Sequence, residues 1–183
     1  MLVSVANVHL VVRGETQKAI ELYKSAQLLA PKNALILNNL ATVLSDDPGR
    51  LKDAIETIDY AIEVAGDKPQ FLDTKAVILR KQSRLDESEK ILVNIVHPEA
   101  DSRYWWHLAE VNWQRFESSQ DRSQVKLAKN HLQQAIDSGL ESAVLTPGEK
   151  ARLLKLKSDL KSQLTDVQNV SASTSPVFAT SQN

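Results

Sequence analysis

The 183-residue sequence contains no cysteine, which excludes disulfide bonds, thiolate zinc sites and a thiol nucleophile. It has only five glycines, and none belongs to a glycine-rich loop of the kind that cradles phosphate. The formal net charge is −1, so the broad basic surface that neutralises phosphates is missing and no nucleic-acid partner is expected. No stretch approaches the roughly 20 apolar residues of a membrane-spanning helix, so membrane insertion is not expected either. Apolar residues nevertheless form 42% of the chain, which is enough for a substantial core.

Small residues recur along the chain with the period of a helical hairpin. A first column, with steps of 34, 35 and 33 residues, consists of Asn7, Ala41, Ala76 and Ala109. A second column, with steps of 35, 34 and 40 residues, consists of Ala19, Ala54, Ser88 and Ala128. A fixed period near 34 residues indicates stacked supersecondary units, each too small to bury its apolar face alone.

Apolar spacing and helix-breaking residues predict an all-α fold of about four helix hairpins. The predicted hairpins span about 1–31, 34–66, 69–98 and 102–139, and the long connector at 117–123 explains the 40-residue step. Thr146, Pro147 and Glu149 predict the start of a capping helix over 147–164, with Arg152 on its outer side. A second capping box is predicted from Ser83 and Asp86. Residues 165–183 are polar and rich in serine and threonine, which predicts a disordered tail.

Four segments resemble tetratricopeptide repeat (TPR) proteins, particularly bacterial ones: AIELYKSAQLLAP (19–31), LNNLATVL (37–44), AIETIDYAIEVAG (54–66) and LDTKAVIL (72–79). The resemblance implies a right-handed superhelical α-solenoid with a concave groove. The groove is lined by the first helix of each hairpin and receives peptides or extended protein segments. It implies no enzymatic chemistry and no cofactor. Asn7 and Asn112 depart from the repeat pattern, because a small and an apolar residue are expected there.

Five of the nine aromatic residues lie between positions 104 and 116. Helical spacing places Trp105 on the same face as Asn112 and Phe116, which we assign to the core. Trp106, Glu110 and Trp113 share the neighbouring face, which the TPR resemblance directs into the groove together with His107. Tryptophan is enriched in binding hot spots, so Trp106 and Trp113 are candidate ligand contacts. The alternative is a structural role, in which they cover the connector or the neighbouring hairpin.

The same groove-facing columns in the preceding hairpins give further candidate protein-binding residues, namely Asn38, Asn39, Thr42, Asp73, Thr74 and Arg80. An asparagine amide donates and accepts hydrogen bonds, so it can pair with a peptide backbone whatever its sequence. The lysine and arginine pattern that clamps a terminal carboxylate in chaperone-binding TPR proteins is not present. His107 and Glu110 are three residues apart, but no motif supplies a third ligand, so no metal site and no catalytic residue is expected.

These features favour an adaptor or scaffold that binds a peptide or an extended protein segment, with no enzymatic activity of its own. Two alternatives remain: a self-association module, and an accessory TPR region of a larger enzyme. The first helix is apolar nearly all round, which suggests either further repeats before Met1 or a homodimer formed through this helix. A cytoplasmic location is expected, or a periplasmic one if the sequence belongs to an exported protein.

Overall fold

The computed structural model describes the backbone of residues 1–173 and the side chains of residues 1–163, and in this part the regular secondary structure is all helical, with no strand. The prediction of an all-α protein is therefore confirmed at the level of fold class. The helices are α1 (Leu2–Asn7), continued by a π-helical turn (Val8–Val12), α2 (Thr16–Leu29), α3 (Ala34–Leu44), α4 (Leu51–Ala65), α5 (Pro69–Lys81), α6 (Leu85–Ile95), α7 (Ser102–Ser119), α8 (Arg122–Asp137) and α9 (Pro147–Ser173).

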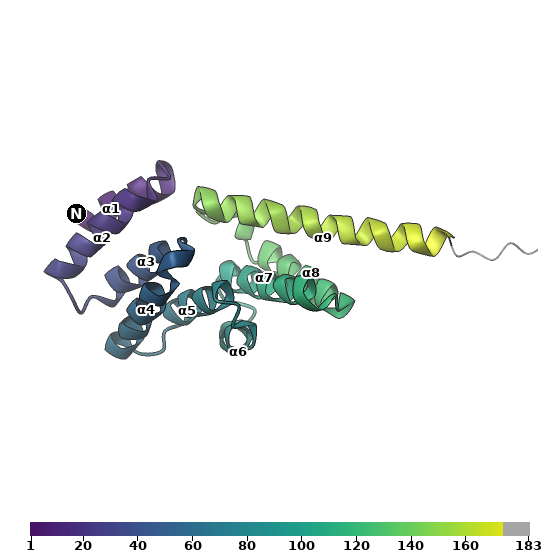
Figure 1. Cartoon of the computed structure of the whole chain (residues 1–183), viewed down its shortest axis with the longest axis horizontal. Coiled ribbons are helices and arrows are strands. Elements are labelled where there is room, and N and C mark those ends of the chain that lie inside the picture. The colour runs from purple at the N-terminus through teal and green to yellow at the C-terminus, as the bar shows by residue number, and fades with distance from the viewer. Residues whose placement is uncertain (174–183) are drawn as a thin grey trace, which may run out of the picture.

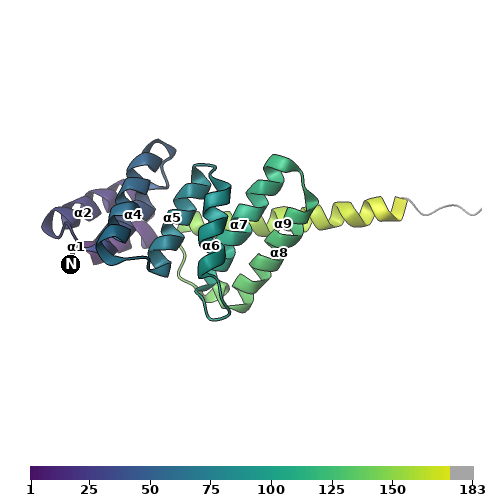
Figure 2. The same cartoon turned by 90° about the horizontal axis from the view of Figure 1, so that it is seen from below.

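Helices α1 to α8 form four pairs, and each pair packs against the next along the chain. Figure 2 shows the pairs side by side in one row. Figure 1 shows that the row bends. Helix α9 begins near the end of α1 and then passes over α7 and α8 (Figure 1). The inner side of this bend, lined by α3, α5 and α7, is called the inner face below.

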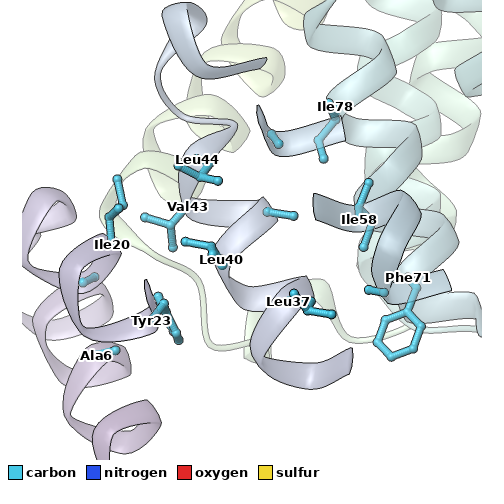
Figure 3. Packing of buried hydrophobic residues seen from close by; sticks show 14 residues of the cluster. Ala6, Ile20, Tyr23, Leu37, Leu40, Val43, Leu44, Ile58, Phe71 and Ile78 are labelled. Atoms are coloured by element: carbon cyan, nitrogen blue, oxygen red, sulfur yellow. The ribbon is translucent and has the colours of Figure 1, made fainter. Parts of the chain in front are cut away.

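The small-residue columns mark where the helices cross. Ala41, Ala76 and Ala109 of the first column are fully buried, as are all four members of the second column. A methyl group or hydroxymethyl group at each crossing lets the backbones approach closely, while larger residues fill the space on either side. Figure 3 shows one such layer, in which Leu37 and Leu40 of α3 lie between α2 and the helices α4 and α5.

The first column begins one residue earlier than the sequence predicts. Ala6 is fully buried, whereas Asn7 is exposed and its side-chain oxygen accepts a hydrogen bond from the Tyr23 hydroxyl. The steps from Ala6 to Ala41 and from Ala41 to Ala76 are both 35 residues, so the true period at this end is longer than the predicted 34. The assignment of Asn7 to the core was therefore wrong.

Local capping chemistry explains where α9 begins. The Thr146 backbone N–H donates to Glu149 Oε2 at 2.7 Å, and the Glu149 N–H donates to Thr146 Oγ1 at 3.2 Å, which confirms the predicted capping box. The capping box predicted at Ser83 is wrong. Ser83 adopts φ of 61°, and α6 starts after Arg84 without a side-chain cap.

Helix α9 continues to Ser173, nine residues beyond its predicted end at residue 164. Residues 165–173 contain neither proline nor glycine, so nothing in this stretch breaks the helix despite its polarity. The prediction of disorder is therefore wrong for 165–173, and residues 174–183 lie outside the described part of the chain.

The other residue that breaks the repeat pattern, Asn112, is fully buried and its amide is satisfied. Asn112 Nδ2 donates to Glu89 Oε1 at 3.4 Å and to Gln124 Oε1 at 3.3 Å. Its oxygen lies 2.7 Å from His131 Nδ1. Burial lowers the pKa of His131, which favours the neutral ring as the donor in this bond. A hydrogen-bonded polar cluster thus replaces the expected apolar contact between α7, α6 and α8.

Candidate functional site

A cavity of about 280 Å³ lies on the inner face, between the π-helical end of α1, the helices α3, α5 and α7, and the first turns of α9. We call it the central cavity. Figure 1 shows α9 beginning opposite α3, and Thr146, Glu149 and Arg152 at the start of α9 line the cavity. Six of the ten residues predicted as protein-binding line the cavity: Asn38, Asn39, Thr42, Asp73, Thr74 and His107.

Asp73 and His107 join two neighbouring hairpins at the floor of this cavity. Asp73 Oδ1 lies 2.7 Å from His107 Nδ1, and the two residues are 34 positions apart, in equivalent turns of α5 and α7. Both side chains are buried, with exposed fractions of 12% for Asp73 and 7% for His107. The second carboxylate oxygen of Asp73 has no partner among the described residues, so it remains available to a ligand.

The two asparagines of α3 add unused hydrogen-bonding groups. Asn38 Oδ1 is buried and has no partner among the described residues. The Asn39 amide also makes no hydrogen bond within this part of the protein. Their positions follow from the helix itself, because the flanking Leu37 and Leu40 are held in the core. Buried polar groups are nearly always paired, so the unpaired Asn38 oxygen marks a place where a polar ligand fits, and the partly exposed Asn39 amide lines the same cavity.

The cations of the central cavity, in contrast, are already engaged. The Lys81 ammonium donates to Ser45 O and Ser45 Oγ, both at 2.9 Å, and to Asp46 Oδ1 at 2.8 Å. Burial lowers the Lys81 pKa, and Asp46 opposes that shift. Arg103 lies 3.6 Å from Asp101, and Arg152 Nε donates to Glu110 Oε1 at 3.2 Å.

The remaining four predicted residues, Arg80, Trp106, Glu110 and Trp113, do not line the central cavity. Glu110 sits between two arginines from different helices. Its Oε2 lies 3.0 Å from Arg80 Nη2 of α5, and its Oε1 accepts from Arg152 of α9. Burial lowers the pKa of Arg80, while the Glu110 charge raises it. This buried charge cluster ties α9 to the row of hairpins.

Trp106 is fully buried, which contradicts the expectation that it contacts a ligand in an open groove. It packs in one apolar cluster with three leucines of α9, namely Leu153, Leu156 and Leu160. The Arg152 guanidinium lies 5.5 Å from the Trp106 ring centre, so Arg152 points inward and its predicted outward position is also wrong. Trp113 is half-buried beside Phe116, with 5.2 Å between the ring centres. On α7, Trp106 and Glu110 are thus covered by residues of the chain's own α9.

Sequence reasoning missed several residues that line the central cavity, among them Tyr104, Asp101, Arg103, Glu149 and Arg152. Tyr104 was noticed only as part of the aromatic cluster, although it lies one helical turn before His107. The α9 residues carried no comparable signal, because the 34-residue period does not extend to this helix.

The residues that the structure describes contain no group of three or more histidine, aspartate or glutamate side chains placed to hold a metal ion. Among the described helices, none combines the length and the apolar character needed to span a bilayer. Comparison with known proteins assigns no family: no family model matches the chain, and a search of curated proteins finds no match.

Proposed function

We propose that this chain is a TPR-like solenoid that binds an extended segment of another protein in its central cavity. The recurring small-residue columns and the paired helices support the repeat interpretation. A right-handed superhelix of about four hairpins, as the TPR resemblance implies, would bring α3, α5 and α7 to one concave side. The proposal that this side binds a peptide is based on the polar side chains that line the central cavity.

The observation that carries this proposal is the unused hydrogen-bonding capacity of Asn38 and Asn39 in a cavity bordered by three successive hairpins. An extended peptide presents a backbone donor and acceptor at every residue, and side-chain amides pair with both. Thr42 and Thr74 add small polar side chains to the same wall, which leaves room for a backbone to approach.

Helix α9 limits how long the bound segment can be. It covers Trp106, which is fully buried, so the central cavity is confined to the space beside α3, α5 and the N-terminal half of α7. A volume of about 280 Å³ lies just below the range of about 300–1,000 Å³ typical of small-molecule pockets. The cavity therefore suits a few residues of a peptide rather than a folded domain.

The test is selection of a phage-displayed random dodecapeptide library on the full chain, followed by fluorescence anisotropy with the selected peptides. Replacing Asn39 by alanine is expected to weaken binding about threefold to tenfold, because a hydrogen bond to the peptide backbone is lost. Asn130→Ala is the matched control, since Asn130 is exposed in the middle of α8 and away from the cavity. Failure to select any peptide, or equal affinity of the Asn39 variant, would refute the proposal.

A second candidate function, self-association, is favoured by the outer side of the first helix. Val5, Val8 and Val12 are 41%, 47% and 74% exposed and follow one another at spacings of three and four residues, which places them on one face. A stripe of exposed valines is unusual for a monomer surface.

If this face pairs with a second copy of the chain, sedimentation velocity will show a dimer that Val8→Glu converts to monomer, since a buried glutamate would lose its hydration. Val93→Glu on α6 is the control, because Val93 is 56% exposed and lies away from α1. A monomer at all concentrations would eliminate this candidate.

A further inference from the structure

We propose that the central cavity selects a bound segment that carries a cationic nitrogen, from a lysine or arginine side chain or from a free N-terminus, and that Asp73 is the residue that binds it. This inference rests on the proposed function and specifies the ligand for the same site. It starts from the charges that face the cavity and the partners that each one has.

Four carboxylates and three permanent cations line the cavity. The carboxylates are Asp46, Asp73, Asp101 and Glu149, and the cations are Lys81, Arg103 and Arg152. Lys81 is neutralised by Asp46, and Arg103 lies next to Asp101. Arg152 is bound by Glu110, which does not line the cavity. Glu149 caps the start of α9. Among the described residues, Asp73 pairs with His107 and with no lysine or arginine.

Asp73 is buried, with 8% of the whole residue and 12% of its side chain exposed. His107 engages only Oδ1, at 2.7 Å, and it fixes the orientation of the carboxylate. The other oxygen has no partner among the described residues. A buried carboxylate forms its strongest hydrogen bonds with ionised donors, and such bonds are roughly twice as strong as neutral ones.

Tyr104 gives independent support, because it places an aromatic ring in the same cavity. Burial raises the pKa of Tyr104 to about 12, and the negative charges of Asp73 and Asp101 add to that shift, so these groups lie within electrostatic range of one another. An aromatic ring next to a carboxylate is a favourable environment for an ammonium or guanidinium group.

The same arrangement disfavours an anionic ligand. A terminal carboxylate in this cavity would meet Asp73, Asp101 and Glu149, while each cation that could attract it already has a carboxylate partner. The carboxylate-clamp mode expected of chaperone-binding repeats is therefore the opposite of the one that these charges support.

The experiment uses peptides selected from the dodecapeptide library described above, measured by fluorescence anisotropy on the full chain. Each peptide is compared with versions in which every lysine or arginine is replaced by glutamine, one at a time, and with an N-acetylated version. Removing the critical cation is expected to weaken binding to the unmodified protein about tenfold or more. The position of the effect tells whether a side chain or the N-terminal amine supplies the charge.

The Asp73→Asn variant completes a double-mutant cycle between Asp73 and the cation of the peptide. Asparagine keeps an oxygen that accepts from His107, so the fold should be retained, but the negative charge is lost. In this variant the penalty for removing the peptide cation is expected to shrink to about twofold or less. Asp67→Asn is the matched control, since Asp67 is exposed in the α4–α5 loop, and it should leave the full penalty in place.

The outcomes separate the two proposals. If peptides are selected but their affinities do not depend on any cation, the inference is overturned while peptide binding stands. A dependence on charge that persists unchanged in Asp73→Asn also overturns it. If no peptide is selected, both proposals fail. The glutamine and acetyl series on the unmodified protein remains decisive even if Asp73→Asn folds poorly.

Discussion

Replacing Glu110 by glutamine is expected to lower the free energy of unfolding by about 3–5 kcal/mol. The Glu110 and Arg80 side chains are only 8% and 12% exposed, so removal of the negative charge leaves the Arg80 guanidinium buried without a counter-charge. Arg152 loses its negatively charged partner in the same substitution, which weakens the attachment of α9. Urea denaturation followed by circular dichroism measures the change.

Glu141→Gln provides a matched control for this prediction. Glu141 also binds a cation of α9, Lys157, at 2.7 Å, but its side chain is 64% exposed. An exposed ion pair contributes about 0–1 kcal/mol, so this variant should unfold at nearly the same urea concentration as the unmodified protein. Equal effects of the two substitutions would mean that the Glu110 cluster is solvated and does not hold α9.

Trp106→Ala is expected to destabilise the protein by about 3–5 kcal/mol through the cavity that it leaves in the core. Trp106 lies on α7 and is fully buried against α8 and the three inward leucines of α9. The sequence left two roles open for Trp106, and if it contacted a ligand, the substitution would instead abolish ligand capture without affecting the fold. Thermal and urea unfolding distinguish the two roles directly.

Leu154→Ala is the comparison for Trp106, because Leu154 lies on α9 but is 67% exposed. Its truncation should change stability by no more than about 0.5 kcal/mol. Stability of Trp106→Ala close to that of the unmodified protein would show that α9 leaves this face in solution, and Trp106 would then return as a candidate ligand contact.

The repeat period was sufficient to predict the helical class and most of the buried helix crossings. Ala41, Ala54, Ala76 and Ala109 are buried because close packing of neighbouring helices allows only a small side chain at the crossing, and this requirement repeats with every hairpin. The position of Asn38 and Asp73 at the cavity was expected from the TPR resemblance, which directs one face of α7 into the groove, and from the period, since residues one repeat apart occupy equivalent turns.

The features that the sequence did not reveal are those that the period does not control. The path of α9 depends on tertiary contacts between Leu153, Leu156 and Trp106, so the covering of α7 had no local signal. The offset at Asn7 comes from a step of 35 residues instead of 34. The pairing of charges in the central cavity depends on which side chains reach one another across helices, and spacing along one helix does not specify this.

The hydrogen bonds that join neighbouring helices connect residues that are close in sequence, and this has a consequence for how the chain reaches its native state. The hydrogen bond with the largest sequence separation that we describe, from Arg152 to Glu110, spans 42 residues. The hydrogen bonds between His107 and Asp73 and between Lys81 and Ser45 span 34 and 36 residues. The entropic cost of loop closure grows only slowly with loop length, and any adjacent pair of hairpins can nucleate the rest. Folding should therefore be fast and can begin during synthesis, before the last helices leave the ribosome.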